Sequence, residues 1–427
     1  MSQGYNMILS NKGIVDSYMH RDPTDTQFSE VLMQHTLSIE WVKEIIGTEN
    51  GGTLGIASNN IQSYTSFNLH DTGDVLSDVF LQTVIPALQA QGTADHMHLV
   101  NAAGYACINN IELKMGNLQY DYQDSVLMYV LEELTTNPAE RLVEETGNYK
   151  DEAALIRAAK GQQVFQVRIP LWFTEDVSQG LKICALGNNA LALNVHWEEF
   201  QYWIVNRGSD VWDSSLISNV KTQLSQASTK LLGRFHFMEE QERSFYTTTP
   251  IMSLFTFYQN DTRQLASSTT QDQNRLQFNF PTTAFIFLVR NSSAFDGQYY
   301  QGKVGTKDKF WFGTPTGVEP LTGIDVKINN SSLLAGYGLN SMFMRTFAAK
   351  HGFGYRPSQP VYVLPFQKRA NKRDNLSSMN CSRFDNIVTT AKLGYTASST
   401  TNTVYTYGVA RNVFTVDTGF ANKPLAA

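Results

Sequence analysis

Two histidine-containing segments have residue types that could hold a metal ion. His96 and His98 alternate along the chain, so in a strand both side chains would project to one face, as the two histidines of a metal site in a β-barrel enzyme do. Such a site also needs a carboxylate and a further histidine, and residues 99–110 contain neither. His196 and Glu198 would also share a face, but they end a predicted strand and are typical of a solvated edge. We therefore predict no metal site and no cofactor.

Other patterns of catalytic residues are missing from the sequence. It contains no Gly-x-Ser-x-Gly, no phosphate-binding Gly-Lys-Ser/Thr loop and no cysteine pair with zinc spacing. Cys107, Cys184 and Cys381 are odd in number and far apart, which is typical of buried free thiols from a reducing compartment. We predict a protein that is not an enzyme.

The elements that would position these residues are mainly strands. Apolar and polar residues alternate with a period of two, which is the pattern of a half-buried strand. The clearest such segments are 111–115, 165–169, 191–195, 234–237, 276–280, 324–328 and 361–364, with a more continuous apolar run at 285–289. Helical spacing is confined to 126–134, 151–156 and, more weakly, 216–224. Many short strands between Gly, Asn, Ser and Pro turns predict sandwiches or barrels with helical insertions.

Length and composition favour two β domains. The chain has 427 residues, which suits two domains of about 200 residues each. We predict an N-terminal arm (1–30), a first β domain (31–238), a charged linker (239–250) and a second β domain (251–427). No apolar run reaches the length of about 18 residues that a membrane span needs, and no secretory signal is visible at the N-terminus.

Charge is divided unevenly between the two halves. Residues 1–250 hold 15 Lys and Arg against 30 Asp and Glu, a net charge of −15, whereas residues 251–427 hold 18 against 9, a net charge of +9. One explanation is that the two domains have surfaces of different charge with no functional meaning. The other is that the acidic and basic halves face each other, within a chain or between neighbouring chains. The basic residues form no helical stripe, which disfavours direct binding of nucleic acid.

The segment from Gly73 to Val84 joins a Gly-Asp turn to a β-branched strand. Gly73 tolerates the positive φ that a tight entry turn can require, Asp74 can bond its own backbone, and Asp78 follows four residues later. This turn and strand resemble the first barrel of the major capsid proteins of nucleocytoplasmic large DNA viruses, which are double jelly-roll proteins.

The resemblance covers residue 36 onward, in the family's order. Similar segments lie at 111–121, 169–186, 235–243, 276–287 and 381–386. The resemblance implies an all-β fold of two consecutive eight-stranded antiparallel jelly rolls. It places Gln241, Glu242 and Arg243 at the junction between the rolls, where we expect an ion-paired clamp, and it places Arg383 and Asp385 in the second roll. Residues 376–379 depart from the family's Pro-Ser-Gly, which leaves a minor or vertex capsid protein as an alternative to the major one.

What the resemblance implies for function is assembly. It implies a homotrimeric, pseudo-hexagonal capsomer that tiles an icosahedral shell, in the outer capsid of a virion and synthesised in the host cytoplasm. The implied partners are other copies, neighbouring capsomers, minor capsid proteins and, through those proteins, the inner viral membrane. A lectin or receptor-binding jelly roll is an alternative, with Tyr299, Tyr300, Trp311 and Phe312 in glycan-binding loops; a cupin-type enzyme is a third.

Two further surface features follow from the sequence. The basic run 368–373 is expected to be an exposed loop whose charge meets an acidic neighbour, with nuclear import or nucleic-acid binding as the alternative. Six Asn-x-Ser/Thr sequons are candidate glycosylation sites for a virus-encoded pathway, at Asn260, Asn291, Asn329, Asn330, Asn375 and Asn380.

Overall fold

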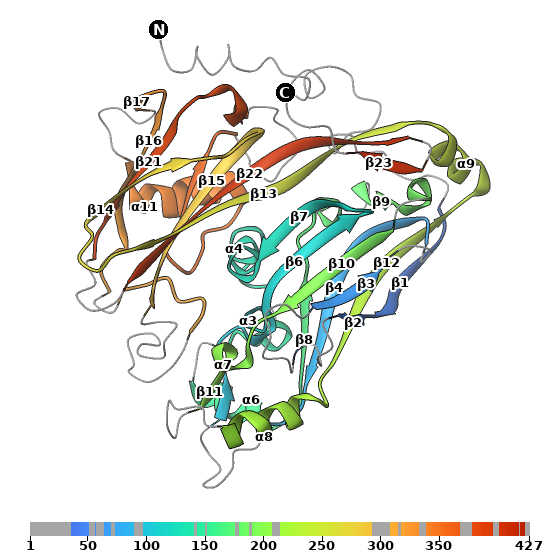
Figure 1. The fold of residues 1–427 in the computed structure, drawn as a ribbon, viewed down its shortest axis with the longest axis horizontal. Coiled ribbons are helices and arrows are strands. Elements are labelled where there is room, and N and C mark those ends of the chain that lie inside the picture. The colour runs from blue at the N-terminus through green and yellow to red at the C-terminus, as the bar shows by residue number, and fades with distance from the viewer. Residues whose placement is uncertain are drawn as a thin grey trace.

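The computed structural model contains two β-rolls that follow one another in the chain (Figure 1). It describes residues 36–50, 56, 64–69, 73–88, 97–140, 143–149, 152–175, 179–187, 190–206, 214–292, 308–314, 317–332, 339–367, 378–395, 401–417 and 419–422. The predicted N-terminal arm lies outside the described residues, so this prediction and the exact domain boundaries stay predictions.

The first roll consists of two antiparallel sheets. The first sheet has the order β1 (Thr36–Ile46), β12 (Ser228–Met238), β4 (Val75–Ile85), β8 (Gln163–Arg168), with β9 (Leu181–Lys182) beside β4. The second has the order β2 (Thr48–Asn50), β3 (Tyr64–Asn68), β10 (Leu191–Trp197), β6 (Ile108–Met115), β7 (Leu118–Asp124). Two short strands, β5 (Met97–Leu99) and β11 (Ile204–Asn206), pair separately.

The second roll repeats this topology. One sheet has the order β13 (Ile251–Leu265), β22 (Asn402–Asp417), β15 (Pro281–Asn291), β19 (Val361–Pro365), with β20 (Met379–Asn380) beside β15 and β23 (Phe420–Asn422) beside β22. The other has the order β14 (Gln271–Leu276), β21 (Ile387–Leu393), β16 (Leu321–Ile328), with the short strands β17 (Ser331–Ser332) and β18 (Leu339–Asn340) beside β16. The strand order is that of a jelly roll in both halves, so the predicted double jelly-roll fold is confirmed.

Helices occupy the connections between strands. In the first roll they are α3 (Ala103–Ala106), α4 (Ser125–Thr135), α5 (Val143–Thr146), α6 (Glu152–Ala159), η2 (Trp172–Thr174), η4 (Ile183–Leu186), α7 (Phe200–Trp203) and α8 (Ser214–Leu224). In the second roll they are α11 (Ser341–Phe343), the π-helix η5 (Met344–Ala348), α12 (Ala349–Phe353) and η6 (Cys381–Arg383). Among the described residues, no helix is both long enough and apolar enough to cross a membrane.

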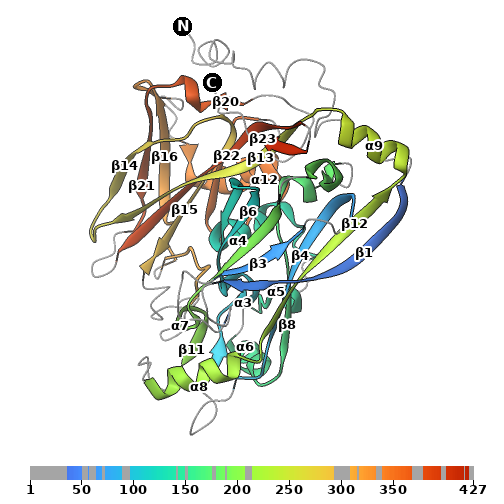
Figure 2. The ribbon, with the colours of Figure 1, turned by 45° about the vertical axis from the view of Figure 1, so that its right-hand side comes forward.

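The predicted linker contains a helix that the sequence analysis did not anticipate. α9 (Glu240–Thr248) connects β12 of the first roll to β13 of the second, at the right of Figure 2. Its first turn carries Glu240 and Glu242, which the positive end of the helix dipole favours. None of its side chains is buried, so the helix has no apolar periodicity from which to predict it.

Most predicted strands are confirmed, but the one at 276–280 is wrong. β14 ends at Leu276, and the chain then leaves one sheet for the other before β15 begins at Pro281. Phe280 has a φ of 71°, which is incompatible with a strand. The alternating pattern arises because Phe278 and Leu276 both point into the core while the chain crosses between sheets.

Close packing explains the glycine at the start of β4. Gly73 does not use a positive φ, contrary to the reason suggested by the sequence. Instead, a Cβ at Gly73 would lie 2.9 Å from both Cβ and Cδ1 of Phe235, which is fully buried on the neighbouring strand β12. Any side chain at this position would separate β4 from β12.

We therefore expect Gly73→Ala to lower the free energy of unfolding by about 1–3 kcal/mol, because overpacking forces the backbone or Phe235 to shift. Gly187→Ala is the matched control, since Gly187 has a right-handed φ of −48° and no atom lies within 4 Å of its added Cβ. Urea unfolding of both variants checks this. Equal effects of the two substitutions would contradict it.

Candidate functional site

The two rolls contact each other along a seam that contains several of the chain's buried polar and aromatic groups. A segment of the second roll, residues 308–314 between β15 and β16, is buried against the first roll, and we call it the seam segment. One hydrophobic core cluster includes Phe310 and Phe312 of this segment together with α4 and β10 of the first roll. The two rolls thus share a core.

A buried ion pair holds the seam segment in place. The Nζ atom of Lys309 lies 2.8 Å from Oε2 of Glu198, and the two side chains are only 5% and 10% exposed. The same ammonium group donates to the carbonyl oxygens of Ala106 and Ile108, at 3.4 and 3.1 Å. Asn109 donates from Nδ2 to Oε1 of Glu198 at 3.4 Å. Each charge is therefore matched by a partner and by additional hydrogen bonds, which is the condition for burying an ion pair.

Aromatic rings hold the residues that follow Lys309 in the seam segment. Tyr129 of α4 stacks on Phe310, with ring centroids 4.5 Å apart and planes inclined by 14°, and it also contacts Phe312. The hydroxyl group of Tyr129 donates to Glu133 on the same helix at 3.3 Å, and Glu133 in turn accepts from the backbone N–H of Ser358 in the second roll at 2.8 Å. The helix α4 is thus held on one side by its own roll and on the other by the second roll.

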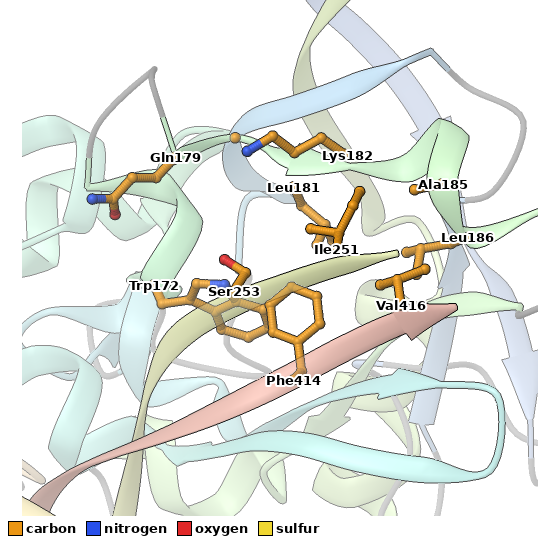
Figure 3. A pocket seen from close by; sticks show the side chains of 11 residues that line it. Trp172, Gln179, Leu181, Lys182, Ala185, Leu186, Ile251, Ser253, Phe414 and Val416 are labelled. Carbon is orange, nitrogen blue, oxygen red and sulfur yellow. The ribbon is translucent and has the colours of Figure 1, made fainter. Parts of the chain in front are cut away.

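A second aromatic cluster extends the seam toward α9. Tyr120 and Trp172 of the first roll contact Phe255 and Phe414 of the second, with centroids 5.3–6.2 Å apart. Beside this cluster lies a small pocket of about 20 Å³, in which the side chains of both rolls face one another (Figure 3). Its walls are mainly apolar, and Lys182 and Gln179 supply polar groups at the edge.

A half-buried carboxylate bonds across the seam at a third point. Asp124 caps α4 by accepting from the N–H of Leu127 at 2.7 Å, and it also accepts from the hydroxyl group of Tyr407 on β22 at 2.9 Å. Burial raises the pKa of Asp124 above its ordinary value, although these two hydrogen bonds oppose the shift. Burial, together with the nearby carboxylate, also holds the pKa of Tyr407 well above its ordinary range, so the phenol stays a donor.

Asp308 carries the one carboxyl side chain of the seam segment (308–314), and its pKa is raised. It is 2% exposed, and burial raises its pKa to about 7, while a 3.0 Å hydrogen bond from the N–H of Phe310 acts in the opposite direction. The hydrogen bond forms the turn that directs the following aromatic residues into the first roll. Near neutral pH this group is poised between its charged and neutral forms.

Asp74 is the centre of the junction that leads into α9. Its Oδ2 accepts from the backbone N–H of Met238 at 2.9 Å, its N–H donates to His236, and its carbonyl accepts from Cys184. Its Oδ1 lies 3.4 Å from Nε of Arg243. The Arg243 side chain is 60% exposed, so the ion pair is solvated and contributes at most about 1 kcal/mol. The structure therefore does not support a large contribution of the Arg243 ion pair to the stability of the junction.

The other residues singled out from the sequence lie apart from the seam. Asp78 pairs with Arg168 of the adjacent strand at 3.1 Å, on the surface of the first sheet. Gln241 is exposed and Glu242 is half-buried on α9. Arg383 and Asp385 are exposed on η6 and just beyond it, where the carbonyl of Asp385 accepts from Arg275 at 2.7 Å.

The histidine segments do not form a metal site in the described part of the chain. His98 is buried, with Nδ1 2.8 Å from the carbonyl of Leu99, and His96 lies outside the described residues. Within the described ranges no group of three or more His, Cys, Asp or Glu side chains could hold a metal ion. The expectation that Glu198 lies at a solvated edge is wrong, because it is buried against Lys309, a partner 111 residues away.

The remaining predictions on surface residues are partly revised. Trp311 and Phe312 are buried in the seam, which removes them from any glycan-binding loop; Tyr299, Tyr300 and the basic run 368–373 lie outside the described residues. All three cysteines are free thiols as predicted, although Cys184 is only half-buried.

Burial divides the candidate glycosylation sites. Asn260, Asn329 and Asn330 are exposed, and Asn375 lies outside the described residues. Asn291 and Asn380 are buried and hydrogen-bonded, to Asn402 and as the cap of η6, so neither is accessible in the folded chain.

Two family models match the chain, approximately one to each roll. The model of the major capsid protein N-terminus matches residues 49–230, and the model of the large eukaryotic DNA virus major capsid protein matches residues 242–421. Among curated proteins, the chain is similar to probable capsid protein 4 of Acanthamoeba polyphaga mimivirus, with 24% identity over 193 residues. The aligned region covers 43% of this chain and 35% of that protein.

Solved structures show the same two-roll fold. A quasi-atomic model of the PBCV-1 virus capsid has a TM-score of 0.70 and 18% identity, covering 94% of this chain and 100% of that one. The Faustovirus major capsid protein has a TM-score of 0.69 and 11% identity, covering 95% of this chain and 94% of that one. At these identities the likeness concerns the fold.

We expect Lys309→Met or Glu198→Gln to lower the free energy of unfolding by about 3–5 kcal/mol, because each leaves a buried polar group without its partner. The double variant should lose about 1–3 kcal/mol less than the sum of the two single losses, since the two groups interact. Lys230→Met is the control, because its pair with Glu44 is exposed, and it should cost at most about 1 kcal/mol. Additive losses in denaturant titrations would show that the pair is not coupled.

We also expect the buried Asp308 to make stability fall as pH rises from about 4 to about 7. The folded chain then holds a proton that the unfolded chain has already released, so each increase in pH favours unfolding until the folded-state pKa of about 7 is passed. Asp308→Asn keeps an acceptor for the N–H of Phe310 and carries no charge. The variant should therefore be more stable than the wild type at pH 8, by at most about 4 kcal/mol, and less so at pH 4. A stability difference that does not change with pH would refute this.

Proposed function

Because the chain belongs to the family of major capsid proteins of large eukaryotic DNA viruses, we propose that three copies of it form a pseudo-hexagonal capsomer that tiles an icosahedral viral shell. The observation that carries this proposal is the seam, which joins two rolls of the same strand order into one unit through a shared core. Three such units supply six similar blocks, and a ring of six similar blocks packs into a flat hexagonal lattice.

The charge distribution supports an alternating ring. In a ring of three chains the rolls alternate first, second, first, second, so every contact between chains joins the half with a net charge of −15 to the half with a net charge of +9. Attraction across these contacts favours alternation over contacts between like rolls. The closed sheets of each roll also leave few strand edges for uncontrolled aggregation.

Location and partners follow from this role. We place the protein in the outer capsid of the virion after synthesis in the host cytoplasm. Its proposed partners are other copies, neighbouring capsomers and minor capsid proteins, and through them the inner viral membrane. A minor or vertex capsid protein is the second candidate function, favoured by the sequence at 376–379, which departs from the family's usual Pro-Ser-Gly.

Purified protein is expected to have about three times the 47.9 kDa mass of the chain in light scattering, and a hexagonal outline in electron micrographs. The trimer should persist at moderate salt, because permanent interfaces depend mainly on buried apolar area and salt weakens only the charged rim. A monomer or dimer that is stable across a wide range of concentrations would reject the capsomer.

A further inference from the structure

An exposed aromatic stripe lies on the helical insertion of the second roll. Phe343, Phe347 and His351 follow one another at intervals of four residues along α11, η5 and α12, and we call them the exposed stripe. Phe343 and Phe347 are 43% and 51% exposed, and their rings stack with centroids 5.0 Å apart. The ring of His351 lies 4.1 Å from that of Phe347. These three adjoining rings form a preformed, largely apolar surface patch, which loses little conformational entropy when a partner covers it.

The exposed stripe lies on an unusual piece of backbone. Residues Met344–Ala348 form a π-helix, a wide turn that is rare and that frequently occurs at functional sites. On the opposite side of this insertion, Met344, Ala349 and Phe353 are buried, in contact with β19. The insertion therefore has one side that belongs to the core of its own roll and one side that presents aromatic rings to the outside.

The corresponding helix of the first roll has both sides covered. α4 directly follows β7, which pairs with β6, just as α11 directly follows β18, which pairs with β16. Nine of the eleven residues of α4 are buried, because the second roll covers the side that its own roll does not. In Figure 1, α4 lies between the two rolls, whereas α11 lies within the second roll, away from the first. Within one chain α4 is thus covered on both sides, whereas the rings of Phe343 and Phe347 stay exposed, although α12 at the end of the same insertion contacts α4.

Charge around the exposed stripe identifies the partner. Residues 341–360 contain no Asp or Glu; Arg345 pairs with Glu319 at 3.1 Å, whereas Lys350 and Arg356 are exposed basic residues. The first 250 residues of the chain have a net charge of −15. An apolar patch with a basic rim fits an apolar surface with an acidic rim, and the first roll of another copy has the required charge.

We propose that the exposed stripe binds the first roll of a second copy of this chain, in the way that the second roll covers α4 within one copy. This inference rests on the proposed capsomer and specifies which surface closes the ring. The two rolls have the same strand order, so they can occupy similar positions in the ring. The contact between the first and second rolls of one chain then has a counterpart between the second roll of that chain and the first roll of the next chain. Each of the three contacts between chains then contains one exposed stripe.

The test compares Phe343→Ser/Phe347→Ser with Phe420→Ser, whose ring on β23 is as exposed as that of Phe347 (51% each) and lies outside the stripe. Light scattering over a dilution series measures the concentration at which oligomers dissociate. We expect the stripe variant to dissociate at a concentration at least tenfold higher than the wild type, and the control to change less than twofold. If the wild type forms trimers and the stripe variant dissociates at the same concentration, the inference is wrong but the proposed capsomer is not. A wild type that never forms trimers overturns both.

A cross-linking experiment keeps the proposal testable if the double variant fails to fold. Phe347 is replaced by the photoreactive p-benzoylphenylalanine, and isotopically labelled and unlabelled copies are mixed before irradiation. Cross-links between labelled and unlabelled chains that end in residues 36–238 support the proposal. Cross-links within one chain only, or ending in the second roll of another copy, overturn it.

Discussion

The contact between the two rolls depends on the buried ion pair of Lys309 with Glu198. Lys309 carries a positive charge into a core of aromatic side chains, and an unpaired charge there would cost several kcal/mol. Glu198 and two backbone carbonyls of the first roll satisfy it, so the seam segment can be stable only when the first roll is folded around it. The aromatic contacts of Phe310 with Tyr129 add apolar area, but they are not specific for one position. The ion pair supplies the specificity, since only one register of the segment places the ammonium group beside the carboxylate.

A fixed angle between the rolls is what an assembly unit requires. The seam is anchored at three separated points: the Lys309 pair, the hydrogen bond between Tyr407 and Asp124, and the cluster of Trp172 with Phe255. Contacts at three separated points fix the orientation of one roll relative to the other. Neither roll can therefore rotate about the short helix α9 that connects them. The solvated pair of Arg243 with Asp74 adds little to this rigidity, and the hydrogen bonds of Asp74 to the backbone of the first roll matter more.

The two rolls share a strand order but differ in what covers their helices. The first roll has an acidic surface, and its α4 is covered by the second roll; the second roll has a basic surface and a helix whose aromatic side is open. Two similar blocks with opposite charge and complementary coverage can repeat around a ring in only one order. In the proposed ring of three chains, that asymmetry favours alternation of the first and second rolls.

Alternation along strands such as β6 and β16 is local, so the sequence predicted the strand content without any knowledge of partners, and the resemblance of its motifs identified the two-roll fold and the family. The sequence also singled out Asp74, but for bonding its own backbone, whereas the Asp74 carboxylate accepts from the N–H of Met238, 164 residues away. It did not reveal the seam. Glu198 resembles a solvated edge residue until Lys309, 111 residues later, is placed beside it, and Trp311 and Phe312 resemble loop aromatics until the first roll buries them. The helix α9 was missed because it buries no side chain. Partnership between distant residues depends on how the two rolls pack, and only the tertiary structure decides that.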